Sequence, residues 1–311
     1  MGAMTKVMEK ILADSPAGAE DQSVAAGSPP IAPPATGAGT ETTSAFVADR
    51  SWTREGPAPA GPSPSTPGGL TETAETVTAE WDPARVDPVV VAFHNRYSAI
   101  CEQYRSVRAR LLAINATRAR QVIALTSSIP EEGKSVSTLN VGLVMAEGGE
   151  HRVLIADGDF RRTSIARMLG IPDAPGLADV LRGERSLEEV LRPTPFPNLR
   201  VLTAGVVQGS AYGELLSSPA TALALGQCRA LFDYTLLDTP PVTTVSDTCL
   251  LAPHCDGAIV VIEMRRTPEP TVQQAVRTLQ ASNVKVLGCM LSRSRDRGTD
   301  YYAHYYSHYY R

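Results

Sequence analysis

The chain has 311 residues and a formal net charge of −4, which gives it no general attraction to nucleic acid. No run approaches the roughly 18 apolar residues of a membrane-spanning helix, and the start lacks the pattern of a signal peptide. We therefore predict a cytoplasmic protein without a nucleic-acid partner, whose recruitment to a membrane would need another protein.

The first 87 residues do not have the composition of a folded domain. From about Asp14 to Asp87 they are rich in Ala, Gly, Pro, Ser and Thr, which bury too little apolar surface to offset the entropy of ordering. We predict a disordered segment over 1–87 that begins with a short amphipathic helix over 4–14. The next stretch, 88–297, is long enough for one α/β domain, and 298–311 form a tail.

A phosphate-binding loop follows the first predicted strand of this domain. The β-branched run 122–125 predicts the strand, the loop TSSIPEEGKS follows, and a helical pattern begins near Lys134. This order suits phosphate because Gly133 permits close backbone approach, Lys134 reaches the β and γ oxygens, and Ser135 offers a hydroxyl to Mg²⁺. The predicted nucleotide contacts in and after the loop are Ser128, Glu132, Gly133, Lys134, Ser135 and Val136.

Two later strands end in carboxylates. The segment RVLIADGDFRR ends its apolar run with Asp157 and Asp159, and YTLLDTPP places Asp238 at its carboxyl end. Side chains at i and i+2 of a strand project to the same face, so both acids could act on one metal ion or one hydroxyl. Parallel sheets bind ligands at the carboxyl ends of their strands. The alternative is that these acids cap turns and that Asp-Thr-Pro-Pro simply stops a strand.

The remaining strands define the fold class. Apolar strands are predicted at GAIVVIEM and KVLGCML, with an amphipathic helix over about 269–282 between them. Alternating strands and helices predict an α/β fold with a doubly wound, mostly parallel sheet, similar to P-loop NTPases. Arg266 and Thr267, at the end of the first of these strands, are expected to lie over the nucleotide site.

Six of the ten tyrosines lie in the last eleven residues, YYAHYYSHYYR. This tail has no Leu, Ile or Val with which the rings could pack. Phosphorylation would add about −1.5 to −2 charges to each side chain, so the tail could act as a strong charge switch. The alternative is an aromatic tail that docks on a partner or a membrane interface. The predicted phosphorylation sites are Tyr301, Tyr302, Tyr305, Tyr306, Tyr309 and Tyr310.

Together these motifs resemble the bacterial protein tyrosine kinases (BY-kinases) of capsule and exopolysaccharide loci. The resemblance runs from about Glu102 to the end and includes a Walker A loop, a Walker A′ strand (LIADGDFRR), a Walker B strand (LLDTPP) and the tyrosine tail. Ahead of the loop, Glu102, Arg105 and Arg108 form the spacing E-x-x-R-x-x-R, which joins subunits into a ring in that family. On a helix these three residues lie broadly along one face, as on an ordinary solvated face.

The resemblance implies a cytoplasmic kinase that uses ATP and Mg²⁺ to phosphorylate its own tail in trans. It also implies a homo-oligomeric ring, a transmembrane activator of the polysaccharide chain-length-regulator type and a cognate tyrosine phosphatase. The kinase would be recruited to the inner face of the membrane and would regulate polysaccharide polymerisation or export.

Phosphoryl transfer requires positioning and charge stabilisation, which assigns roles to the polar residues. We expect Lys134, Asp157 and Asp159 to be catalytic, and Ser135, Asp157 and Asp238 to hold Mg²⁺. Tyrosine has a pKa near 10, so its hydroxyl arrives protonated and a carboxylate must orient or deprotonate it. Asp157 is the first candidate, with Asp159 assisting, although the two could exchange roles.

Several positions depart from the family pattern. Glu131 stands where the loop often has Gly, Thr163 replaces a Pro, and Ser292 replaces an Asn of the last strand; the long Pro-rich N-terminal segment is also unusual. Two other functions remain open. A partitioning-type ATPase switch would have a lysine early in the loop, as in K-G-G-x-G-K, which SSIPEEGK lacks. A nucleotide-binding adaptor would dock through its tail without kinase activity.

Overall fold

The computed structural model describes residues 46–48, 81–209 and 212–292. The predicted N-terminal helix, most of the predicted disordered segment and the whole tyrosine tail lie outside these residues.

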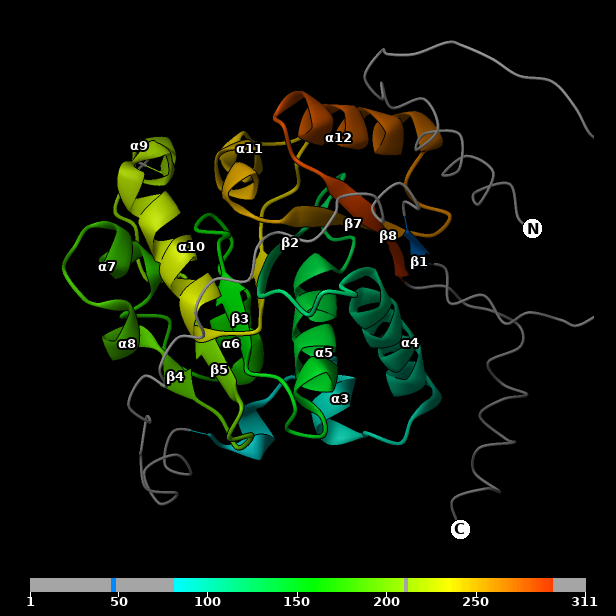
Figure 1. The fold of residues 1–311 in the computed structure, drawn as a ribbon, viewed down its shortest axis with the longest axis horizontal. Coiled ribbons are helices and arrows are strands. Elements are labelled where there is room, and N and C mark those ends of the chain that lie inside the picture. The colour runs from blue at the N-terminus through cyan, green and yellow to red at the C-terminus, as the bar shows by residue number, and fades with distance from the viewer. Residues whose placement is uncertain (1–45, 49–80, 210–211, 293–311) are drawn as a thin grey trace, which may run out of the picture.

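The described chain forms one sheet in the order β1-β8-β7-β2-β6-β3-β5-β4 (Figure 1). The six central strands are parallel, and β1 and β4 pair antiparallel at the two edges. This confirms the predicted doubly wound, mostly parallel α/β fold. The strands are β1 (Phe46–Ala48), β2 (Gln121–Ser127), β3 (Val153–Asp157), β4 (Arg192–Pro193), β5 (Leu199–Leu202), β6 (Tyr234–Asp238), β7 (Gly257–Glu263) and β8 (Val286–Ser292).

Helices cover both faces of the sheet. Figure 1 shows α4 and α5 together on one side and α10 and α12 on the other. The helices are α3 (Val91–His94), α4 (Ala99–Ile114), α5 (Lys134–Ala146), α6 (Ile165–Leu169), α7 (Leu177–Leu181), α8 (Leu187–Val190), α9 (Tyr212–Ser217), α10 (Pro219–Leu231), α11 (Asp247–Leu251) and α12 (Glu269–Ala281), with short 3₁₀ turns η2 (Pro83–Arg85) and η3 (Ala252–His254). No helix in the described ranges is long and apolar enough to span a bilayer.

Alternate strand residues supply the two faces of the core. In β3, Ile155 packs with α4 and α5, whereas Leu154 packs with α7 and α10 on the opposite face. All five residues of β3 are buried, as expected for a parallel strand covered on both sides. Helix α5 approaches the sheet very closely: a Cβ on Gly142 would lie 2.4 Å from Ile155 Cγ1. This contact helps to hold the start of α5 at the carboxyl end of β2.

The described domain begins at Trp81, ahead of the predicted boundary at Pro88. Trp81 is 6% exposed, and its indole N–H donates to the Pro193 carbonyl over 2.8 Å. Val86 and Val90 are also buried in the same core. A single buried tryptophan within a Pro- and Ala-rich stretch gives no periodic signal, so composition alone could not place this boundary.

Candidate active site

Three adjacent central strands bring the predicted site residues together. Strand β6 lies between β2 and β3, and the phosphate loop leaves the carboxyl end of β2. Asp238 is in register with Leu125 on one side and with Asp157 on the other. The parallel register therefore places the loop and the two carboxylates together at the carboxyl ends of the strands, where such sheets bind ligands.

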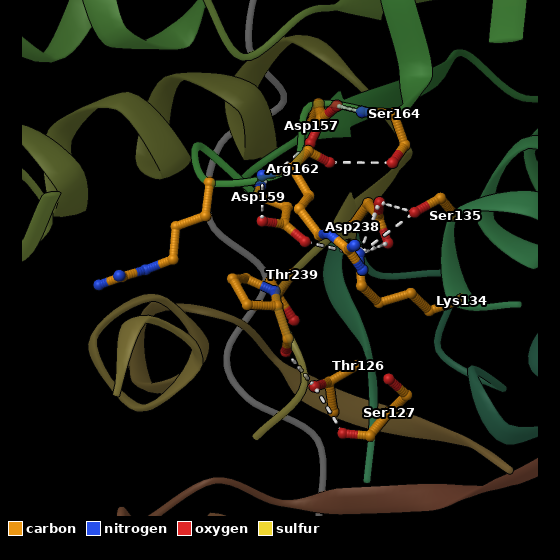
Figure 2. A network of polar contacts seen from close by, with 12 residues as sticks. Thr126, Ser127, Lys134, Ser135, Asp157, Asp159, Arg162, Ser164, Asp238 and Thr239 are labelled. Carbon is orange, nitrogen blue, oxygen red and sulfur yellow. Dashed lines mark hydrogen bonds and ion pairs between the residues drawn. The ribbon is translucent and has the colours of Figure 1, made fainter. Parts of the chain in front are cut away.

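Lys134 is a buried cation among carboxylates (Figure 2). Its Nζ lies 2.9 Å from Asp159 Oδ2 and 3.2 Å from Asp238 Oδ2, and it also contacts Ser135 Oγ at 3.2 Å. The Ser135 hydroxyl donates to Asp238. Burial lowers the pKa of Lys134, but the charges of Asp238 and Asp159 outweigh this effect and raise that pKa above its usual range. Lys134 therefore stays charged, and the side chains form one electrostatic cluster.

The two acids of β3 and its following loop have different surroundings. Asp157 is fully buried and accepts three backbone N–H bonds, from Asp159 at 3.0 Å, Ser164 at 3.0 Å and Ile165 at 3.1 Å. Burial, together with the charge of Asp238, raises the pKa of Asp157 to about 8 despite these bonds. Burial also raises the pKa of Asp238, against the opposing effect of Lys134. Asp159 is also buried, at 2% exposure, but it forms part of the wall of an open cleft, where it accepts from the Arg162 N–H and pairs with Lys134.

This cleft, of about 730 Å³, is bounded by three segments. The phosphate loop and the start of α5 form one wall, the segment after β3 forms a second, and Pro240 to Val245 form a third. Of the predicted nucleotide contacts, Gly133, Lys134, Ser135 and Val136 line it. Ser128 does not, and its hydroxyl is buried without a hydrogen-bond partner in the described chain.

Glu132 holds the phosphate loop to strands β7 and β8 rather than pointing into the cleft. Its carboxylate is fully buried and accepts from the Ile129 N–H at 2.8 Å, the Glu263 N–H at 3.2 Å and the Thr267 hydroxyl. Its backbone carbonyl accepts from Ser292 Oγ at 2.6 Å. The sequence predicts that Glu132 and Thr267 contact the nucleotide, but in the structure these two side chains hydrogen-bond to each other and hold the loop against β7.

The charged residues close to Glu132 on the outer side of the loop are exposed. Glu131 has φ +68°, in the left-handed region that favours glycine, which gives a physical reason for Gly at this position in the family pattern. Arg266 donates to Glu263 at 2.9 Å and lies 3.9 Å from Glu131, so it covers the outer side of the loop. Arg162 also lies 3.9 Å from Glu131, and both of these side chains are about two-thirds exposed.

Arg161 and Asp247 form an ion pair that sequence reasoning missed. Arg161 donates to both oxygens of the buried Asp247, at 2.7 and 3.0 Å, and its guanidinium lies over the Tyr212 ring at 4.8 Å. This pair joins the loop after β3 to α11. No local motif in the sequence marks Asp247 as its partner.

The E-x-x-R-x-x-R residues lie on α4, as expected, and Arg105 has partners within its own chain. It makes a two-point ion pair with Glu147 at the end of α5, at 2.8 and 2.7 Å, and it also contacts Glu102. Hydrogen bonding to Glu147 is the largest cause that raises the pKa of Arg105. Arg108 is half-buried on the same helix. The predicted role of these residues between subunits stays a prediction.

The cleft suits a nucleotide with Mg²⁺. Helix α5 starts at Gly133, whose φ of +86° turns the loop into the helix, and the free N–H groups of a helix start bind phosphate. The Ser135 hydroxyl and the Asp238 carboxylate are oxygen ligands of the kind that Mg²⁺ prefers. Within the described ranges, no three His, Cys, Asp or Glu side chains are arranged to hold a metal ion by themselves.

Known proteins are similar to this chain in sequence and fold. No family profile matches the chain. EpsB of Ralstonia nicotianae is 33% identical over 61% of this chain, which spans only 25% of EpsB. The tyrosine-protein kinase YwqD of Bacillus subtilis is 31% identical over 65% of this chain and 85% of YwqD. The solved chimerical protein CapA2B2 has a TM-score of 0.63 and 25% identity, covering 72% of this chain and 100% of the chimera. The match to nearly the whole of YwqD, with the loop and carboxylates in place, shows that this chain belongs to the bacterial tyrosine-protein kinase family.

Proposed function

We propose that this protein transfers the γ-phosphoryl group of ATP to tyrosine, and that its own C-terminal tyrosines are acceptors in trans. The observation that carries this proposal is the cluster of Lys134, Asp159 and Asp238 in an open cleft, in a chain that ends in three Tyr-Tyr pairs. We further propose that this activity regulates the synthesis or export of capsule or exopolysaccharide, as the names of similar proteins such as the succinoglycan transport protein ExoP suggest.

In this proposal the phosphate loop holds the nucleotide. Backbone N–H groups at the start of α5 bind the β and γ phosphates together with Lys134. To do so, Lys134 gives up its contacts with carboxylates and contacts phosphate oxygens instead. Ser135 and Asp238 would hold Mg²⁺, which would supply positive charge to offset the negative charge of the phosphates. Glu132 keeps the loop in the required shape.

The geometry favours Asp159 as the residue that meets the acceptor hydroxyl. Both acids are buried, but Asp159 belongs to the cleft wall beside Lys134, whereas Asp157 does not line the cleft and its oxygens accept from three backbone N–H groups. Asp159 would orient the tyrosine hydroxyl and accept its proton, and Asp157 would position the loop that carries Asp159. This assignment exchanges the roles expected from the sequence.

We propose a homo-oligomer as the working form, with Glu102, Arg105 and Arg108 at subunit contacts, because tail phosphorylation in trans needs a second copy. A transmembrane activator would recruit the protein to the inner face of the membrane. The name of the chimera CapA2B2 supports a pairing of CapA-type and CapB-type proteins, and CapB of Staphylococcus aureus is 28% identical to this chain over 90% of its own length. A cognate phosphatase would reverse the reaction.

The test is mass spectrometry of the purified protein after incubation with Mg²⁺ and ATP, with and without a candidate activator. Wild type is compared with Lys134→Met and with a chain that ends at Asp300. Phosphate confined to the six tail tyrosines and absent from Lys134→Met supports the proposal. ATP binding without any phosphate gain, even with the activator, would instead favour the adaptor or the ATPase switch.

A further inference from the structure

The cleft has more cationic side chains than the proposed binding of phosphate and Mg²⁺ requires. Four cationic side chains line it, namely Lys134, Arg161, Arg162 and Arg167. Lys134 is engaged by buried carboxylates, and Arg161 by both oxygens of Asp247. Arg162 and Arg167 are exposed. These two guanidiniums are therefore the ones available to a ligand.

Neither of these arginines has a strong partner in the described chain. Arg167 makes no side-chain hydrogen bond or ion pair there. The closest carboxylate to Arg162 is Glu131 at 3.9 Å, and both side chains are about two-thirds exposed, so this pair contributes little to stability. An anion that competes with Glu131 for Arg162 would therefore displace a weak contact.

Their position indicates which ligand they serve. Both arginines belong to the wall that follows β3, as Asp159 does, and Arg162 lies 3.9 Å from Glu131 of the phosphate loop. The nucleotide phosphates are expected on the loop side, at Lys134 and the start of α5. The wall after β3, which carries Asp159 and the two arginines, is left for the acceptor segment.

The tail itself supplies a matching anion. Its tyrosine pairs recur every four residues, at 301/302, 305/306 and 309/310, so a tyrosine in the site always has another pair a few residues away. Once phosphorylated, such a neighbour carries about −1.5 to −2 charges and oxygens that pair with guanidinium groups through two parallel hydrogen bonds.

We propose that Arg162 and Arg167 form a subsite for a phosphotyrosine already present in the acceptor segment, so that the first phosphate on a tail promotes the next. This rests on the proposed function. The donor remains ATP: the acceptor oxygen forms the new P–O bond, the bond to ADP breaks, and the acceptor proton passes to Asp159. The bound phosphotyrosine is not altered.

The experiment uses the full chain with its six tail tyrosines changed to Phe, so that only an added peptide is phosphorylated. Peptides of the sequence 299–311 are supplied either unmodified or with phosphotyrosine at position 305. With Mg²⁺ and ATP, the wild-type site should use the modified peptide about tenfold more efficiently in kcat/KM, as expected for a charge-assisted contact at a partly exposed site. Arg167→Gln should bring the ratio of the two kcat/KM values, modified peptide over unmodified peptide, close to one. Arg185 is an exposed arginine outside the cleft, so Arg185→Gln should leave this ratio unchanged.

Two results would overturn the proposal. One is a ratio near one with the wild-type site; the other is a ratio that Arg162→Gln and Arg167→Gln together do not change. A raised KM for ATP with an unchanged ratio would assign the arginines to the nucleotide. If neither peptide gains phosphate, the proposed function fails, and anisotropy of the fluorescently labelled phosphopeptide decides the subsite separately. Binding about tenfold weaker in Arg167→Gln supports it, and equal binding rejects it.

Discussion

Changing Glu132 to Gln should weaken the phosphate loop from the inside. The carboxylate is fully buried and accepts from the N–H groups of Ile129 and Glu263 and from the Thr267 hydroxyl. A glutamine can present its carbonyl oxygen to Glu263 and Thr267 only by turning its NH₂ group toward Ile129. Two donors then face each other, and the Ile129 N–H loses its acceptor.

The size of the effect follows from that single lost acceptor. A buried donor left unsatisfied costs about 1–3 kcal/mol, so we expect a loss of about 2 kcal/mol. If the loop opens locally while the domain stays folded, the same free energy weakens ATP binding about 30-fold. Glu132→Ala leaves three donors without an acceptor and should cost roughly 4 kcal/mol, a large part of the stability of an ordinary domain.

Urea denaturation and ATP titration of the same samples measure both quantities. Glu131→Gln is the matched control, because Glu131 is the adjacent loop carboxylate and its side chain is 66% exposed with ion-pair partners at 3.9 Å. We expect its stability to change by less than about 0.5 kcal/mol. If Glu132→Gln matched Glu131→Gln in both urea midpoint and ATP affinity, the buried contacts of Glu132 would not be what holds the loop in place.

Three further predictions concern charge. Lys134→Met should abolish phosphate transfer and destabilise the fold by roughly 3 kcal/mol at pH 8, because it leaves the buried Asp159 and Asp238 without their cation. The loss should be smaller at pH 5, where these unpaired buried carboxylates take up protons more readily, as urea midpoints at both pH values will show. Without Mg²⁺ and nucleotide, stability should fall as pH rises from about 4 to about 8, because folded Asp157, with its pKa raised to about 8, keeps a proton that the unfolded chain has lost. Asp157→Asn should reduce this slope and leave the part due to Asp238, whose pKa is also raised by burial, and an unchanged slope would contradict the assignment. A double-mutant cycle on Arg105 and Glu147 should give a coupling of about 1 kcal/mol, since the pair makes two hydrogen bonds and both side chains are about three-quarters buried; zero coupling would mean that it does not join α4 to α5.

Local signals predicted the parts of the site that lie close together in the chain. Lys134 and Ser135 follow a strand and begin a helix, and the strand ends at Asp157 and Asp238 are visible as apolar runs that stop at an acid. The fold class followed from the alternation of strands and helices, because a parallel connection needs a crossover. Parallel strands present their carboxyl ends at one edge, so the convergence of these residues was also predictable.

Only the tertiary structure decided what each carboxylate does. Glu132 looks like a nucleotide contact in the loop, yet its partners, Glu263 and Thr267, come from the end of β7 and the turn after it, far along the chain. Asp157 and Asp159 are equivalent in the sequence and differ because one is enclosed by the backbone before α6 and the other faces the cleft. The amino-acid sequence determined which chemistry is present and at which edge of the sheet it lies. The order of the strands and the packing of the loops after them decided which charged groups are buried, because burial depends on neighbours that are distant in the chain.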